Sequence, residues 1–216
     1  SICYKCNYGN GIYMNSRNGT GLNYASQNIT VRDVAMIDYD TPSGQGIRVS
    51  DGVNVLLDHI TILSNPAVGG TQHGITTDDR TKYGSTAAEN SVTITNVAIS
   101  GVEDLGIRIS GFNAFSGSNL FVHNTTTPFT PSAGHPNWTK ESTTAPGMGT
   151  CKLWVPAGAP GKGAGTGGSD IGATILYRYN NGVLSTTPLW DPRTGEFPHG
   201  AEDADGTNRV PGESLF

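Results

Sequence analysis

Two arginines at equivalent positions of a repeated motif have the clearest potential for chemistry. The motif reads Gly46-Ile-Arg-Val49 in one segment and Gly106-Ile-Arg-Ile109 in another, and related segments begin at Gly11 and Gly74. In a strand that alternates apolar and other residues, the third residue of this motif points away from the core. If the segments stack as strands, four such residues form one outward row: Tyr13, Arg48, Thr76 and Arg108. A guanidinium group binds a carboxylate or sulfate through two parallel hydrogen bonds, so the row is suited to an acidic sugar.

The predicted spacing of the two arginines fits a polymer of such sugars. Stacked strands lie about 4.8 Å apart, so residues two strands apart would be separated by about 10 Å, comparable with two sugar units. The predicted substrate-binding residues are Tyr13, Arg48, Thr76, Asp78, Asp79 and Arg108, with Arg80 at the edge of the same face. An elimination reaction without a metal needs one group that neutralises the substrate carboxylate and one base. The candidates for these catalytic roles are Arg48, Arg108 and His73; the alternative is a solvated face held by ordinary ion pairs.

Calcium is the one cofactor for which the sequence offers candidate ligands. Asp203, Asp205 and Asn208 alternate around a glycine near the C-terminus. Oxygen side chains of this kind are typical of calcium loops, although the spacing is not that of an EF-hand. The alternative is an ordinary polar turn.

The three cysteines are Cys3, Cys6 and Cys151. Cys3 and Cys6 have the spacing of half a zinc site, but the chain has no second pair to complete it. The alternatives are a disulfide from one of them to Cys151, or unpaired thiols.

A second motif alternates strictly with the first along the chain. It occurs at residues 28–34, 54–60, 91–97 and 119–125, and its sixth position gives a polar ladder: Asp33, His59, Asn96 and Asn124. Short polar side chains commonly end strands by bonding to exposed backbone groups, which is the role that we expect here. The adjacent Asp58 and His59 have the composition of an oriented base, but the ladder favours a hydrogen-bonded structural role for His59.

The two interleaved motifs predict an all-β fold, a right-handed parallel β-helix of about four coils over residues 1–127. A unit of two short strands cannot bury an apolar face alone, whereas stacked units of roughly 26 to 37 residues can. Successive strands are parallel because the chain must complete a coil before pairing, and parallel crossovers are almost always right-handed. The variation in coil length falls in loops at 39–45, 65–73 and 78–90, where binding sites are usually built.

Residues 128–216 are predicted to be an irregular C-terminal extension. Pro128, Pro131 and Pro136 interrupt the strand pattern, and residues 158–172 consist almost entirely of small residues. Two β-rich runs within 173–187 flank Asn181-Gly182, a strong signal for a β-hairpin. We expect this arm to pack on the β-helix or on a neighbouring subunit, which makes self-association possible.

Composition restricts the partners. Charged residues make up 14% of the 216-residue chain, glycine occurs 30 times and the net charge is −5. Without a basic cluster or a long apolar run, we expect neither nucleic acid nor a membrane as a partner, and a polysaccharide or other glycan is the expected ligand. The start at Ser1, with the first repeat beginning almost at once, favours a processed protein or an excised fragment, and the expected location is extracellular. The four N-glycosylation sequons matter only if the source is eukaryotic.

Residues 28–110 resemble the pectate lyase family. Asn54-Val-Leu-Leu-Asp-His59 is similar to that family's Asn-Val-Trp-(Ile/Val)-Asp-His signature, with Leu56 in the place of Trp, and the preceding Gly46–Gly52 segment resembles the family's strand and turn. The resemblance implies a parallel β-helix and β-elimination on polygalacturonate, with calcium held by carboxylates and an arginine as the base. The positions that correspond to the calcium carboxylates, however, are Ser43, Gln45, Gln72 and Thr76, and Glu103 or Asp104 replaces the substrate-binding Lys. No arginine follows in the coil after Asn119 to serve as the base.

Two functional hypotheses follow. The first is an extracellular, non-catalytic β-helix that serves as a structural, adhesive or glycan-binding element. The second is a polysaccharide lyase. The missing carboxylates favour the first hypothesis, because neutral amides and hydroxyls bind calcium far less well.

Overall fold

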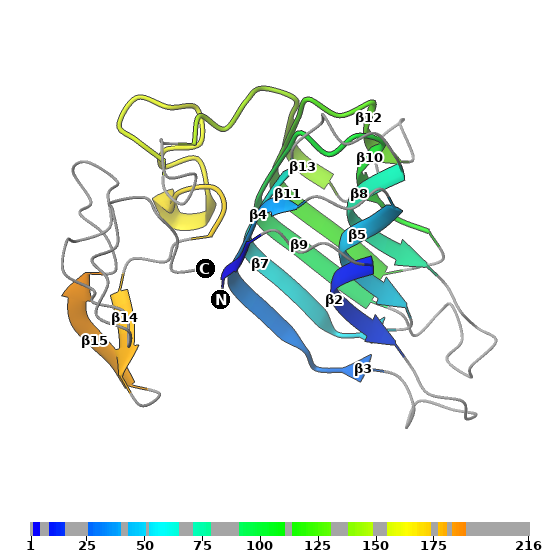
Figure 1. The fold of residues 1–216 in the computed structure, drawn as a ribbon, viewed down its shortest axis with the longest axis horizontal. Coiled ribbons are helices and arrows are strands. Elements are labelled where there is room, and N and C mark those ends of the chain that lie inside the picture. The colour runs from blue at the N-terminus through cyan, green and yellow to red at the C-terminus, as the bar shows by residue number, and fades with distance from the viewer. Residues whose placement is uncertain are drawn as a thin grey trace, which may run out of the picture.

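The protein folds as a parallel β-helix of several coils, which confirms the fold class predicted from the repeats (Figure 1). The structure is a computed structural model, and it describes residues 2–4, 9–15, 26–39, 43–50, 52–64, 71–78, 91–110, 114–130, 138–148, 155–173, 177–180 and 183–188. Within these ranges, the regular elements are strands and one short 3-10 helix at Thr166–Gly168. No helix of the described residues is long and apolar enough to cross a membrane.

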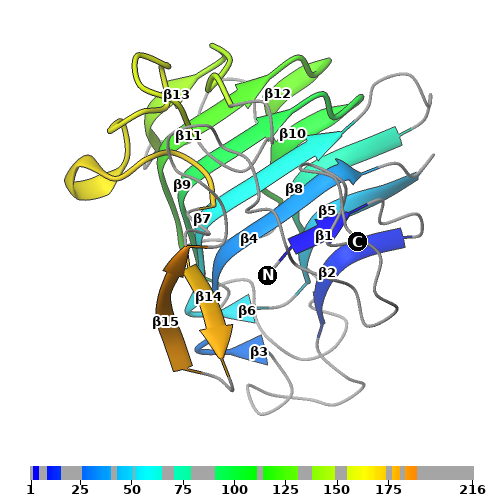
Figure 2. The ribbon, with the colours of Figure 1, turned by 60° about the vertical axis from the view of Figure 1, so that its left-hand side comes forward.

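One wall of the coil is a six-stranded sheet in which every neighbouring pair is parallel. Its strands, in spatial order, are β1 (Ile2–Tyr4), β4 (Thr30–Tyr39), β7 (Val55–Ser64), β9 (Ser91–Ser100), β11 (Ala114–His123) and β13 (Trp138–Ser142). Figure 2 shows β4, β7, β9 and β11 side by side in this order.

The opposite wall is a five-stranded parallel sheet. Its strands, in spatial order, are β12 (Thr127–Thr130), β10 (Leu105–Arg108), β8 (Thr71–Asp78), β5 (Ser43–Ser50) and β2 (Gly9–Asn15). A third, short parallel pair consists of β3 (Ser26–Gln27) and β6 (Gly52–Val53). The chain passes from one wall to the other in each coil, so that side chains of both walls meet in a common core.

Apolar ladders fill this core. Ile47, Ile75 and Ile107 pair across the five-stranded sheet and are completely buried. Ile62 and Ile99 pair across the six-stranded sheet and are equally buried. Alternation within each strand sends one set of side chains inward, and the stacking of coils repeats that set.

The first residue of the Gly-Ile motif is glycine because neighbouring coils approach closely there. A Cβ on Gly74 would lie 2.5 Å from the carbonyl oxygen of Gly106 and 2.9 Å from Cδ1 of Ile99. Equivalent contacts occur at Gly11 and Gly46, each of which would place a Cβ 2.8 Å from the next coil's carbonyl oxygen. Strand β5 begins three residues before Gly46, and strand β8 begins three residues before Gly74. The predicted loops at 39–45 and 65–73 are therefore shorter than expected.

The predicted polar ladder is correct at three positions and wrong at the fourth. Asn119, rather than Asn124, aligns with Asn96, because β11 pairs with β9 from Ala114 opposite Ser91 to His123 opposite Ser100. Asp33, His59, Asn96 and Asn119 all have a left-handed backbone, with φ between 52° and 56°. The ladder therefore does not end the strands as predicted; each strand continues through it.

A glycine explains the misplaced register. Gly117 occupies the inward position opposite Ile94, where an apolar side chain was expected. The Phe115 ring lies close to it: a Cβ on Gly117 would be 3.2 Å from Cζ of Phe115. Phe115 therefore fills volume that an aliphatic side chain fills in the other coils.

Both sheets continue beyond residue 127, where the predicted coils end. β12 adds a strand beside β10, and β13 adds one beside β11. Pro128 is compatible with β12 because this strand is at the edge of the five-stranded sheet, where a missing N–H leaves no ladder bond unmade.

Residues 155–173, which we call the strap, lie on the outer side of the six-stranded sheet, away from the five-stranded sheet (Figure 1, yellow). The Gly172 amide donates to the Asn96 carbonyl oxygen at 2.9 Å, and the Ala173 amide donates to Oγ1 of Thr61 at 2.8 Å. Thr61 is completely buried as a result. Packing of the C-terminal extension on the β-helix was predicted; its docking on this ladder was not.

The predicted hairpin is confirmed. β14 (Tyr177–Asn180) and β15 (Val183–Pro188) pair antiparallel, and Asn180 faces Val183 across the Asn181-Gly182 connection.

Candidate functional site

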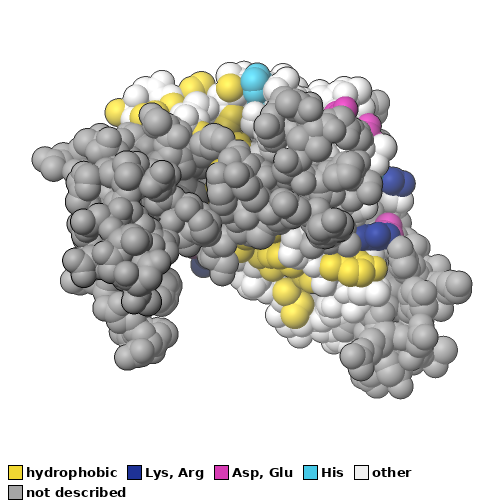
Figure 3. All heavy atoms as spheres, in the orientation of Figure 1, with side chains coloured by type: hydrophobic (Ala, Val, Ile, Leu, Met, Phe, Trp, Pro, Cys, Tyr) yellow, Lys and Arg dark blue, Asp and Glu magenta, His cyan; other side chains and the backbone are white. Residues whose placement is uncertain are grey.

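The third residues of the Gly-Ile motif form one row across the five-stranded sheet. Tyr13 pairs with Arg48, Arg48 with Thr76, and Thr76 with Arg108. The row lies on the outer face, since the residues on either side of it, Ile47 and Val49 in β5, are completely buried. Figure 3 shows Lys or Arg and Asp or Glu side chains together at the right-hand edge of the molecule, where Figure 1 places this sheet.

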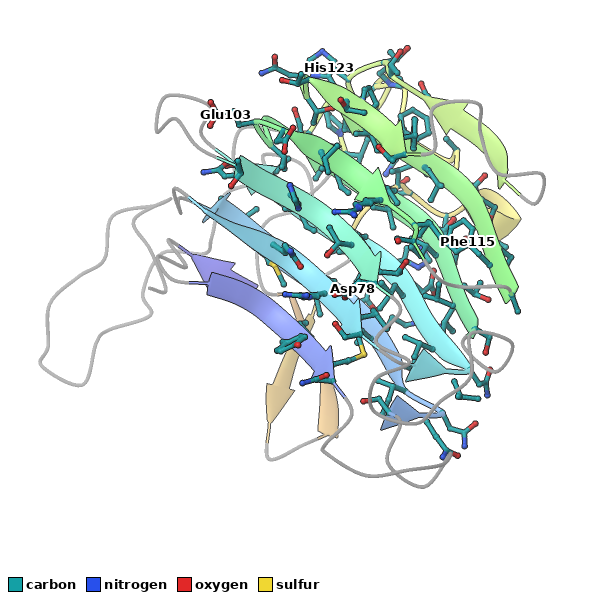
Figure 4. The ribbon with its side chains drawn as sticks, turned by 90° about the vertical axis from the view of Figure 1, so that its right-hand side faces the viewer. Asp78, Glu103, Phe115 and His123 are labelled. Carbon is teal, nitrogen blue, oxygen red and sulfur yellow. The ribbon has the colours of Figure 1, made fainter. Side chains whose placement is uncertain are left out.

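Arg48 is held in place by two groups, the carboxylate of Asp78 and the ring of Tyr13. Its Nη2 lies 2.5 Å from Oδ2 of Asp78, and its Nε lies 3.2 Å from Oδ1 of the same carboxylate. The guanidinium carbon lies 5.2 Å from the centre of the Tyr13 ring, within the range of a cation–π interaction. Asp78, at the end of β8 in Figure 4, also accepts a hydrogen bond from Ser50.

These contacts determine the protonation state of Arg48. The hydrogen bond that Arg48 donates to Asp78 is the main cause that raises the pKa of Arg48 above its usual value, with the charge of Asp78 adding to it and burial opposing it. Arg48 therefore remains a cation. It is suited to binding an anion and poorly suited to accepting a proton as a catalytic base.

Arg108 is the accessible cation of the row. Its side chain is exposed, and no described residue forms a hydrogen bond or ion pair with it. Its cross-strand neighbours are Thr76 and Thr130, both small and uncharged. Among the described residues, the guanidinium donors of Arg108 are therefore not engaged, unlike those of Arg48.

Two further polar contacts involve residues of the same sheet. Oγ1 of Thr76 donates to Oε1 of Gln45 at 2.5 Å. His73 pairs with Gln45 and Leu105 in the strand register, and its Nε2 lies 3.1 Å from Oδ2 of Asp104. Nδ1 of His73 is buried without a hydrogen-bond partner among the described residues. His73 thus adjoins the row, but its Nε2 is already engaged by Asp104.

The structure separates the positions that correspond to the calcium carboxylates of pectate lyases. Gln45 and Thr76 bond to each other, whereas Gln72 is completely buried and accepts a hydrogen bond from Ser64. Among the described residues, no three His, Cys, Asp or Glu side chains lie close enough together to hold a metal ion. The following predicted residues lie outside the described part of the chain: Asp79, Arg80, Asp203, Asp205, Asn208, Cys6 and Cys151.

A second polar cluster, which sequence reasoning identified only in part, lies on the six-stranded sheet. Nδ2 of Asn119 donates to Oδ1 of Asn96 at 2.9 Å, and Nδ2 of Asn96 donates to Oδ1 of Asp58 at 2.8 Å. The strap joins this cluster, because the Thr166 amide donates to Oδ1 of Asn96 at 2.9 Å. The repeats identify Asn96, but no sequence signal connects it to Thr166, 70 residues away.

The fold and the outward row define the class of the protein as a parallel β-helix with a polar, arginine-bearing sheet face. Comparison with known proteins adds no family: no family model, no curated protein and no solved structure matches the chain.

Proposed function

We propose that the protein is a secreted β-helix that binds an acidic polysaccharide along the outer face of its five-stranded sheet. The observation that carries the proposal is the single register row in which Arg108 is open and Arg48 is stacked over Tyr13. Fold alone does not determine function, so the proposal depends on this row.

The chemistry of the row favours an acidic sugar. Arg108 offers a planar fork of donors that matches a carboxylate or sulfate group. Tyr13 is 42% exposed and provides an apolar ring edge beside Arg48, while Thr76, between the two arginines, is buried and its hydroxyl is bonded to Gln45. Arg48 and Arg108 are two strands apart, about 10 Å, which lets adjacent or alternate sugar units contact both.

Binding without cleavage is the proposed outcome. A lyase needs a base near the substrate, and Arg48 is kept protonated by Asp78. His73 is engaged by Asp104 through its Nε2. The proposed roles are therefore structural, adhesive or glycan-binding, and pectate-lyase-like elimination is the alternative.

Affinity electrophoresis combined with an absorbance assay distinguishes these alternatives. We expect polygalacturonate or alginate in the gel to retard the protein, a neutral dextran not to, and added salt to weaken the retardation by screening. We expect no rise in the ultraviolet absorbance of unsaturated uronate, with calcium or with chelator. A calcium-dependent rise would establish the lyase alternative, and equal migration in all gels would refute glycan binding.

A further inference from the structure

Three side chains on the six-stranded sheet are joined in series. Oγ of Ser169 lies 3.0 Å from Nε2 of His59, and Nδ1 of the same imidazole lies 2.8 Å from Oδ1 of Asp58. Ser169 comes from the strap and is 110 residues from His59 in the sequence. The arrangement exists only when the strap is docked on the ladder.

Hydrogen-bond chemistry fixes the tautomer of His59. A carboxylate only accepts hydrogen bonds, so Nδ1 of the imidazole must donate to Asp58. In the neutral ring, Nε2 is then the acceptor and the Ser169 hydroxyl is the donor. This is the orientation in which a histidine can remove the proton of a serine nucleophile.

Asp58 is itself held firmly. It is 5% exposed, and its Oδ2 accepts a hydrogen bond from Nε of Arg32 at 2.8 Å. Its Oδ1 also accepts from Asn96 at 2.8 Å. With its carboxylate fixed on both oxygens, Asp58 orients the imidazole rather than taking up the proton.

We propose that Ser169, His59 and Asp58 form a nucleophilic triad that hydrolyses small carboxylic esters, such as O-acetyl groups. The triad meets two geometric requirements of such a site: the nucleophile is bonded to the base, and the base is bonded to an orienting carboxylate. It lies on the sheet opposite the arginine row, so it does not rest on the proposed glycan binding.

The surroundings of Ser169 leave room for an acyl group. Ser169 is partly exposed, and the His59 side chain is 16% exposed. A Cβ placed on Gly167 or Gly168, the two residues before Ser169, would meet no atom of the described residues within 4 Å. A small ester can therefore approach the hydroxyl from the side of these glycines, where a larger acyl chain has no described wall to pack against.

The reaction needs only the ester and water. Oγ of Ser169 forms a bond to the acyl carbon while its proton moves to Nε2 of His59. The C–O bond to the alcohol then breaks, and the alcohol leaves with that proton. Water gives a proton to His59 as its oxygen attacks the acyl-serine. The Oγ–acyl bond then breaks as His59 passes that proton to Oγ, so that the carboxylic acid leaves and Ser169 and His59 are restored.

A fluorophosphonate probe tests this proposal on the full chain, followed by mass spectrometry of the labelled peptide. We expect the wild-type protein to carry the label on Ser169 and to hydrolyse p-nitrophenyl acetate. Ser169→Ala is expected to lower that hydrolysis by at least about 100-fold, since it removes the nucleophile. His59→Asn, which retains a residue that tolerates positive φ, is expected to abolish labelling.

Ser116→Ala is the matched control, because Ser116 lies on the same sheet and its hydroxyl bonds to Thr93 instead. It should keep both labelling and hydrolysis. An unlabelled wild-type Ser169, or equal labelling in His59→Asn, would overturn the proposal. The hydrogen bond between Ser169 and His59 would then serve only to hold the strap on the sheet. That reading predicts only a lower melting temperature for Ser169→Ala. Circular dichroism confirms that each variant is folded.

Discussion

Asn96→Leu is expected to lower the free energy of unfolding by about 5 kcal/mol, the largest effect of any single substitution in the ladder. Asn96 is 2% exposed and bonds to Asp58, Asn119 and the Thr166 amide. Leucine would remove all three hydrogen bonds, at about 1 kcal/mol or more each. It would also impose a left-handed backbone, φ 55°, on a side chain that avoids it, at about 1–2 kcal/mol.

Urea unfolding measures this effect, and Asn96→Gly separates its two causes. Glycine adopts positive φ freely but loses the same hydrogen bonds, so it should recover about 1–2 kcal/mol relative to leucine. Thr93→Ser, at an exposed position in the same strand, should change stability by less than about 0.5 kcal/mol. A loss below about 1 kcal/mol for Asn96→Leu would mean that the ladder does not anchor the strap.

Gly74→Ala is expected to cost about 3 kcal/mol, because the added methyl group has no space between coils. Its Cβ would lie 2.5 Å from the carbonyl oxygen of Gly106, a backbone atom that cannot move without displacing β10. It would also approach Ile99, at the centre of the core. The change in thermal or urea unfolding midpoint measures the cost.

Gly158→Ala serves as the comparison. In the part of the chain that the structure describes, a Cβ at Gly158 would meet nothing within 4 Å, and the positive φ of 82° accounts for a cost of about 1 kcal/mol. If Gly74→Ala were no more destabilising than Gly158→Ala, the close approach of coils at the Gly-Ile motif would be refuted.

The sequence was sufficient to predict the β-helix because stacking repeats each packing requirement in every coil. Ile47, Ile75 and Ile107 recur at one motif position, and the structure pairs them in register. The fourth ladder position was misplaced because Gly117 carries no side chain to mark the inward position. Volume shared between neighbouring residues, as with Phe115 and Gly117, is not visible as a pattern in one strand.

For the candidate site, the sequence could predict only which residues share the outer face of the sheet. Alternation within the strands placed Tyr13, Arg48, Thr76 and Arg108 on one side, and their row in the sheet follows from the repeat register. The Arg48–Asp78 ion pair joins residues 30 positions apart, and its formation depends on the length of an intervening loop. Contacts of the strap, such as Ser169 with His59, depend on tertiary docking and have no local signal.

Titration of an oligogalacturonate into the wild-type protein and Arg108→Gln, by calorimetry, tests the central claim most directly. We expect Arg108→Gln to weaken binding by at least about 10-fold, since a hydrogen bond to a charged group contributes about 1.5–3 kcal/mol. Arg108→Lys should be intermediate, because it keeps the charge and loses the planar fork. Lys162→Gln, which removes one charge from the strap on the opposite sheet, should bind as the wild type does. Equal affinity of Arg108→Gln and Lys162→Gln, or no binding by the wild type, would contradict a glycan-binding role for this face.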